Sequence, residues 1–259
     1  NPLPHGFSGI FAAIPFAIWF FLAIEGVANV AEEAIDPQRS ILIGFGSAIL
    51  TLVILCLLTF TSAVGVAGWE AVVYPEGSTL ASDSPLPLAL SYVVASDHIL
   101  YKLLVGIGLL GLIASFHGII LAGGRATFEF GRKGYAPLYL GNVQSRFRTP
   151  ANALIANMIV GIITLFTGKT GEIITIACFG ALALYIVSML AFFALRKKEP
   201  GMVRPFRVPM FPLFPATALI IASIAFVAMT YYNQGLALIF FGIVGISYLY
   251  FLIFLNKKM

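Results

Sequence analysis

Residues 16–29 read Phe-Ala-Ile-Trp-Phe-Phe-Leu-Ala-Ile-Glu-Gly-Val-Ala-Asn, an apolar run interrupted by Glu25 and Gly26. A charged side chain at membrane depth costs about 2.5–3.5 kcal/mol on insertion scales, so it persists where it faces protein, water or a ligand. The neighbouring glycine weakens the helix and leaves space and backbone groups beside the carboxylate. This pattern is typical of discontinuous helices in polytopic membrane proteins.

The composition predicts an all-α, polytopic membrane protein. Hydrophobic residues make up 60% of the 259 positions and charged residues only 10%, with a mean hydropathy of +0.99. A soluble domain with this balance would not stay dispersed, and several runs are long enough to cross a bilayer. The pI is about 9.1, but the basic residues lie in short connectors between apolar runs, so nucleic acid is not an expected partner.

Seven transmembrane spans are predicted, of which the fourth is short. Tight turns at Gly168–Gly171 and Asn233–Gly235 join the fourth span to the fifth and the sixth to the seventh. The spans cover approximately residues 8–30, 40–66, 99–123, 150–167, 172–195, 212–233 and 235–255.

The distribution of Lys and Arg predicts the orientation of these spans. Thirteen of the 15 lie in four alternate connectors, and only Lys102 and Lys169 lie on the other side. Basic connectors mark the cytoplasmic face, which places Asn1 outside and the C-terminus inside. In the outer connector 68–97, Ser84 followed by Pro85 predicts a short surface helix that ends near Val94. The basic connectors are Ala31–Arg39, Gly124–Thr149, Arg196–Pro212 and Asn256–Met259.

Glu25 is the first candidate for chemistry. It is either a carboxylate that binds a ligand or carries a proton, or a structural acid paired with a neighbouring helix. No Lys or Arg occupies the middle of a predicted span, so its partner would be a cationic substrate, a proton or a residue outside this sequence. Trp19, Phe20 and Phe21 would add cation–π attraction to a bound ammonium group, or would simply pack against lipid and core.

His117 is the other ionisable residue deep in a predicted span. It is either a proton carrier or a neutral imidazole that is hydrogen-bonded in the bundle. Nearby Ser115 and Gly118 are small and allow close approach of a ligand or of another helix. Cys56 and Cys178 fall in apolar spans and are expected to be inert core residues. The sequence has no zinc-ligand spacing, nucleophile elbow or phosphate-binding glycine loop, so no metal, no cofactor and no enzyme activity is expected.

Two stretches resemble the amino acid–polyamine–organocation (APC) superfamily of permeases. Residues 20–39 are similar to the sixth helix and following loop, in which an acidic broken helix leads into Ala31-Glu32-Glu33 and Asp36-Pro37-Gln38-Arg39. Residues 124–137 and 148–153 are similar to the loop between helices eight and nine. Within the superfamily, residues 23–33 most resemble bacterial ethanolamine permeases. The resemblance extends over essentially the whole chain.

The resemblance implies a fold of two inverted five-helix repeats followed by two further helices. The seven spans would then be helices six to twelve, with residues 1–195 forming the second repeat and residues 196–259 the accessory pair. The first repeat would be missing, and the chain would be a piece of a longer protein of the bacterial inner membrane. The lipid bilayer and this missing repeat are therefore expected partners.

The resemblance also implies a substrate site. The unwound segment would be about Ala23–Gly26, with Glu25 at the family's acidic position. Relatives often carry glycine where Ala23 stands, and some place a large aromatic residue where Gly118 stands, so the break and the lid are expected to differ from theirs in this chain. Substrate contacts would come from Phe20, Phe21, Ala23, Ile24, Glu25, Gly26, Ser115 and Gly118, and proton coupling from Glu25 and His117.

The resulting expectation is part of a secondary active transporter for ethanolamine or a related small amine or amino acid. It would work by alternating access and be coupled to protons. A general amino acid permease of the same superfamily is the alternative. A seven-helix receptor fits the span count but lacks an intramembrane lysine or an outer cysteine pair, and an intramembrane enzyme would have only Glu25 and His117 to act with.

Overall fold

The computed structural model describes residues 6–22, 24, 26, 34–204, 208 and 210–255. Within these residues the chain is helical, and its one β-type pairing is an isolated bridge between Gln144 and Thr149. The chain divides into two compact units, a larger one (Asn1–Ile41 with Gly123–Met259) and a smaller one (Leu42–Ala122). Each is described by itself.

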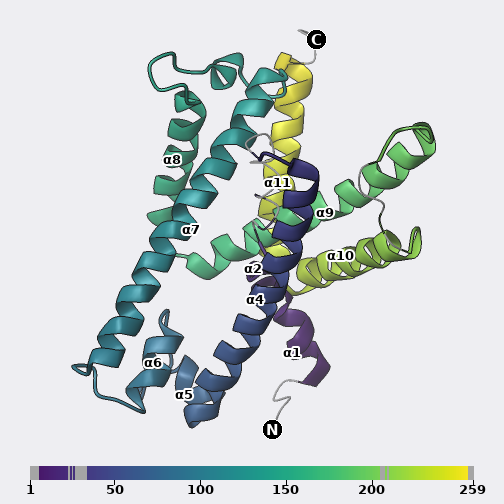
Figure 1. The fold of residues 1–259 in the computed structure, drawn as a ribbon. Helices are drawn as coiled ribbons and strands as arrows, with labels where there is room; N and C mark the ends of the chain where they lie inside the picture. The colour runs from purple at the N-terminus through teal and green to yellow at the C-terminus, as the bar shows by residue number, and fades with distance from the viewer. Residues whose placement is uncertain are drawn as a thin grey trace. The chain divides into compact units, whose positions relative to one another are not determined.

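The larger unit holds most of the helices (Figure 1). Its elements are α1 (Gly6–Ala12), α2 (Ile14–Trp19), the last turns of α7 (Ile99–Arg132), the 3₁₀ helix η2 (Leu138–Gly141), α8 (Ala151–Leu165), α9 (Thr170–Lys198), α10 (Leu213–Tyr232), α11 (Gln234–Tyr250) and the π-helical turn η3 (Phe251–Leu255). The smaller unit contains most of α4 (Pro37–Ala67), α5 (Trp69–Val73), α6 (Pro85–Ser91) and the remainder of α7.

Five helices in the described part of the chain are long and apolar enough to cross a membrane. They correspond to the second, third, fifth, sixth and seventh predicted spans. The fourth predicted span is the shorter α8, with 15 residues. These helices make the chain a multi-pass membrane protein, whereas the count of seven spans and the inverted repeat stay predictions. The five are Arg39–Ala67, Ile99–Arg132, Thr170–Lys198, Leu213–Tyr232 and Gln234–Phe254.

The first predicted span, 8–30, is not one continuous helix in its described part. It is divided at Ala13 into α1 and α2, and α2 ends at Trp19. Pro15 stands near the start of α2, where a residue without an N–H is tolerated because the first helical N–H groups have no intrahelical acceptor. At its other end, α2 stops at Trp19, which is earlier than the unwound segment at Ala23–Gly26 that the resemblance predicts.

Two other predictions concern the connectors. The short helix after Ser84 is confirmed as α6, although the Ser84 side chain makes no capping hydrogen bond; its backbone carbonyl accepts from the N–H of Leu88 at 3.1 Å. The helix of the third predicted span, 99–123, continues beyond that span to Arg132 as α7. The two glycines at 123 and 124 do not stop the helix, since α8 packs against this turn and Leu154 occupies the space beside Gly124.

The core of the larger unit lies where α9, α10 and α11 meet. Phe179 on α9 is fully buried, stacks on Phe240 at 5.5 Å between ring centroids and meets Phe226 edge-on at 5.7 Å. Small residues on the facing helices let the backbones approach closely, as in helix packing within lipid. The buried cluster consists of Cys178, Phe179, Leu182, Ala222, Ala225, Met229 and Ala237.

A glycine pair holds the end of α7 against η2. A Cβ on Gly131 would overlap the backbone nitrogen of Gly141 and lie 2.8 Å from the carbonyl carbon of Leu140. A Cβ on Gly141 would lie 2.5 Å from the backbone nitrogen of Arg132. Both neighbours are backbone, which cannot rotate away as a side chain can. The contact therefore requires glycine at both positions.

Replacing Gly131 with alanine is expected to destabilise the protein by about 1–3 kcal/mol, the usual cost of overpacking. The melting temperature Tm of the detergent-purified protein should fall by several degrees relative to Gly111→Ala. Gly111 lies on the same helix, and a Cβ built there meets no atom within 4 Å in the described chain. Equal Tm values for the two variants would contradict the glycine contact.

Candidate functional site

The segment after α2 is where the sequence places the substrate site. The helix tightens there: the N–H of Phe21 donates to the Ile18 carbonyl at 2.9 Å, and that of Leu22 donates to the Trp19 carbonyl at 3.2 Å. Phe20 and Phe21 lie in this turn and are exposed, whereas Ile24 and Gly26 are half-buried. Ala23 and Glu25 lie outside the described residues. The described backbone thus leaves its helix at Trp19, six residues before the predicted acidic position, and Gly26, which was predicted to be unwound, is helical.

The helix that leads into this turn is anchored on α9. Pro15 is fully buried, and its carbonyl accepts a hydrogen bond from the Cys178 thiol at 3.1 Å. Ile14 and Ile18, one turn apart on α2, pack against the buried cluster around Phe179. Cys178 is therefore a packed core residue, as predicted, and neither cysteine forms a disulfide. Its hydrogen bond joins α2 to α9.

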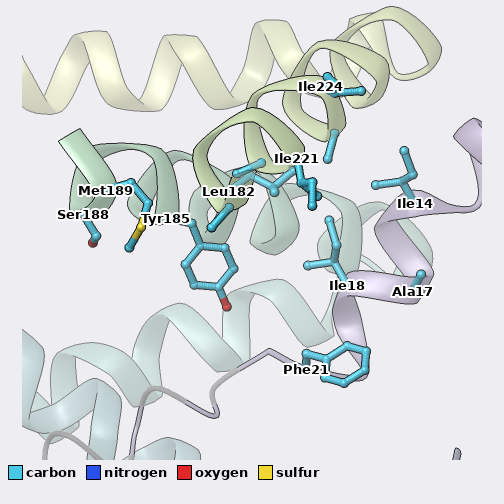
Figure 2. Close-up of a pocket in the computed structure, with 13 residues that line it drawn as sticks. Ile14, Ala17, Ile18, Phe21, Leu182, Tyr185, Ser188, Met189, Ile221 and Ile224 are labelled. Carbon is cyan, nitrogen blue, oxygen red and sulfur yellow. The ribbon is translucent and has the colours of Figure 1, made fainter. Parts of the chain in front are cut away.

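A cavity of about 730 Å³ lies between α2, α9 and α10 in the larger unit. Figure 2 shows Ile14, Ile18 and Phe21 on its α2 side and Leu182, Tyr185 and Met189 on its α9 side. Among the described residues that line it, the polar side chains are those of Tyr185 and Ser188. The lining residues are Ile14, Ala17, Ile18, Phe21, Leu182, Tyr185, Ser188, Met189, Ala218, Ile221, Ala222, Ile224 and Ala225.

This cavity has the volume of a small-molecule site but an almost wholly apolar wall. An ammonium ion placed against such a wall would lose its hydration without gaining a counter-charge or hydrogen bonds, so its binding there would be unfavourable. The rings of Phe21 and Tyr185 offer cation–π faces, but the compensating negative charge has to come from elsewhere. In this sequence Glu25 is the nearest carboxylate along the chain to Phe21. The arrangement suits binding rather than bond-making.

The second set of predicted residues lies on α7, in the smaller unit. Ser115, His117 and Gly118 are all exposed there, and a Cβ on Gly118 would meet no atom within 4 Å in the described chain. The His117 Nδ1 lies 2.7 Å from the carbonyl oxygen of Ile113, to which the protonated Nδ1 donates. The proton on Nδ1 leaves Nε2 as the acceptor of the neutral ring.

Helix geometry separates these three residues. Successive residues are rotated by about 100°, so Ser115 and Gly118 lie about 60° apart on one face, while His117 lies about 160° from Ser115. The predicted ligand contacts on this helix therefore share a face that His117 does not. Phe20 and Phe21 belong to the larger unit, and Ser115, His117 and Gly118 belong to the smaller one.

Tyr185 and Ser188 line this cavity and were not among the residues predicted from the sequence. Both stand inside α9, in the run Leu182-Ala183-Leu184-Tyr185-Ile186-Val187-Ser188, three residues apart. Together with Leu182 they follow a spacing of three, which places them along one face of a helix. Polar side chains in register within an apolar span were the available signal.

Within the described residues, no group of three or more His, Cys, Asp and Glu side chains could hold a metal ion. The two ion pairs that the structure describes, Glu129–Arg132 at 3.3 Å and Lys169–Glu172 at 2.9 Å, are exposed and lie within single segments of the chain. Neither contributes to the cavity between α2, α9 and α10.

Comparisons with known proteins agree with a transport role. The chain matches the amino acid permease family over residues 1–258. It is 30% identical to an uncharacterized transporter of Rhizobium meliloti, in an alignment that covers 97% of this chain and 53% of that protein. It is 26% identical to the methylthioribose transporter of Bacillus subtilis (82% and 44% covered) and 25% identical to the branched-chain amino acid permease BcaP of Lactococcus lactis (83% and 44% covered).

The chain spans about half the length of the curated relatives it matches. The match nevertheless runs through all its helices, from α1 to α11. The relatives are named as transporters and permeases rather than as enzymes or receptors. This chain belongs to the amino acid permease family, within the APC superfamily.

Proposed function

We propose that the chain is the C-terminal part of a secondary active transporter that moves ethanolamine, or a related small amine or amino acid, by alternating access coupled to protons. One observation carries this proposal: α2 ends at Trp19, inside the apolar run that leads to Glu25, and residues 20–22 form a turn. A helix end in a bilayer exposes backbone groups that need partners, and a substrate can supply them.

The ligand class follows from the charges. Glu25 has no Lys or Arg in the middle of any apolar span of this chain, which favours a cationic ligand or a proton as its partner. A primary ammonium donates up to three charge-assisted hydrogen bonds to a carboxylate and to backbone carbonyls. The rings of Phe20 and Phe21 stand directly before this position along the chain. These features together favour a small amine.

The proposed contacts are divided between two segments. Phe20, Phe21, Ala23, Ile24, Glu25 and Gly26 would bind from the break after α2, and Ser115 and Gly118 from the small-residue face of α7. Glu25 and His117 would carry the coupled proton. The hydrogen bond from His117 Nδ1 to Ile113 supports this role, because it holds the ring in one orientation with Nε2 as the proton-accepting atom.

An amino acid permease is the second candidate. Relatives of this chain include a branched-chain amino acid permease of Lactococcus lactis and an aromatic amino acid transport protein, AroP, of Escherichia coli O157:H7. An amino acid shares the ammonium group of ethanolamine but adds a carboxylate, for which free backbone N–H groups at a helix N-terminus are a ready partner. Competition by amino acids against ethanolamine uptake separates the two candidates.

We also propose that the protein lies in the bacterial inner membrane with the first residue of this chain outside and the last in the cytoplasm. The support is the placement of 13 of the 15 Lys and Arg residues in alternate connectors. The preceding half of the protein would supply the first repeat and complete the substrate site.

Replacing Glu25 with glutamine in the full-length protein is expected to abolish proton-dependent uptake or to weaken substrate binding at least about tenfold, because a charge-assisted hydrogen bond contributes roughly 1.5–3 kcal/mol. Uptake of radiolabelled ethanolamine in vesicles, with and without an imposed pH gradient, measures both effects. Glu172→Gln is the matched control, since Glu172 pairs with Lys169 at the exposed start of α9. Wild-type, pH-dependent uptake by the Glu25 variant would refute the assignment.

The orientation is tested by cysteine labelling in intact cells. A membrane-impermeant maleimide should label Thr79→Cys, in the connector 68–97, and should label Ser145→Cys, in the connector 124–149, only after the cells are opened. Both residues are exposed, and the parent protein without the added cysteine is the control. Labelling of Ser145→Cys in intact cells would reverse the proposed topology.

A further inference from the structure

Arg196, in the last turn of α9, is held between aromatic rings. Its guanidinium carbon Cζ lies 4.2 Å from the centroid of the Phe211 ring and 5.1 Å from that of Phe192. Phe211 also meets Phe192 at 6.1 Å and Phe193 at 5.9 Å between centroids. We call Phe192, Phe193 and Phe211 the aromatic platform. It keeps the planar guanidinium in one place, so that less side-chain entropy is lost when an anion binds.

The charge on Arg196 is not neutralised within the described part of the chain. Its Nε is buried and has no hydrogen-bond partner there, and the ion pairs described are those of Arg132 and Lys169. Lys197 and Lys198 follow in the same turn, which adds positive charge at a helix C-terminus. A half-buried cation without a counter-ion, beside two more cations, favours an external anion.

Arg204 shows how a neighbouring guanidinium differs. It donates to the carbonyl oxygens of Glu199 at 2.6 Å, Met202 at 3.0 Å and Pro200 at 3.2 Å, and so binds the chain that follows α9. Its donors are occupied by the backbone. Arg196 makes no such bonds in the described chain and is therefore the residue that is available to a ligand.

The surroundings of Arg196 indicate where the anion comes from. Arg196 stands at the end of one candidate membrane span, and Phe211 stands just before the start of another, α10. The neighbours of Arg196 and Phe211 along the chain include exposed apolar side chains: Leu195, Met210, Leu213 and Phe214. A free inorganic anion has no use for these side chains, whereas a phospholipid places its phosphate beside the cation and its acyl chains against them.

We propose that Arg196 and the aromatic platform bind the phosphate of an anionic phospholipid headgroup where α9 ends and α10 begins. The guanidinium donates two parallel hydrogen bonds to the phosphate oxygens, while its face stays on Phe211. Lys197 and Lys198 contribute long-range attraction only. This site is separate from the proposed transport activity and does not depend on its substrate.

The test uses the purified full-length protein and native mass spectrometry with palmitoyl-oleoyl phosphatidylglycerol and phosphatidylcholine at equal concentration. Wild-type protein should bind phosphatidylglycerol preferentially, and Arg196→Lys, which keeps the charge but loses the planar fork, should bind it about tenfold more weakly. Phe211→Leu keeps every charge and should weaken binding about 2–5-fold, as expected for a lost cation–π contact. The double variant Lys197→Gln/Lys198→Gln is the matched charge control and should retain most of the preference.

Four results would overturn the proposal. Equal binding of the two lipids by the wild type would mean that the contact is apolar only, or that a carboxylate elsewhere in the protein already occupies Arg196. Unchanged phosphatidylglycerol binding by both Arg196→Lys and Phe211→Leu would exclude the site. A loss in the double lysine variant as large as in Arg196→Lys would show a diffuse charge effect. Displacement of the lipid by an equal concentration of inorganic phosphate would show a free-anion site.

Discussion

Backbone hydrogen bonding inside a bilayer is the constraint on which the other features of this chain depend. Lipid offers no donors or acceptors, so a segment that crosses it is helical, and a helix that stops within it needs other partners for its last carbonyl groups. In the first predicted span, the end of α2 at Trp19 would be such a stop. It would be tolerable only where protein, water or a bound molecule meets the freed groups. The same constraint that makes this chain helical is therefore also the reason why we propose a ligand site after α2.

Close packing supplies the stability that hydrophobic burial alone does not give within lipid. Lipid tails are as apolar as the side chains, so helices associate where small residues let their backbones approach. Ala222 and Ala225 on α10 receive the bulky Phe179 of α9, and Gly131 receives the backbone of η2. Both contacts depend on small residues, alanine in one and glycine in the other. Atoms added at these positions therefore destabilise the packing more than atoms removed from them.

Much of the fold could be predicted from the sequence because apolar length is a strong signal. The second, fifth, sixth and seventh spans agree with α4, α9, α10 and α11 to within a few residues. The continuation of α7 to Arg132 was not predicted, because residues 124–132 were interpreted as part of a basic connector, and the packing of Leu154 of α8 beside Gly124 is visible only in the structure. The division of the first span at Ala13 was also not predicted, because a proline such as Pro15 is compatible with a new helix start but does not require one.

The candidate site was harder to predict than the helices. Glu25 is conspicuous because a charge among apolar residues is costly, so one position could be named from the sequence alone. Tyr185 and Ser188 were missed, because a hydroxyl in an apolar span is common and says nothing about which helix it faces. The apolar lining of the cavity could not be predicted from the sequence either, since it is formed by three helices, α2, α9 and α10, of which α2 is far from the other two in the chain.

The bond between Cys178 and Pro15 sets how compliant the junction between α2 and α9 is. A thiol is a weak donor, and its neighbours Ile14 and Ile18 are held by contacts that have no strict direction. Such a junction keeps α2 in register at rest but resists a small rotation only softly. An ion pair at the same place would oppose the rotation of α2 against α9 with a larger energy barrier. The weak contact seen here would allow α2 to rotate slightly against α9 during the alternating access proposed above.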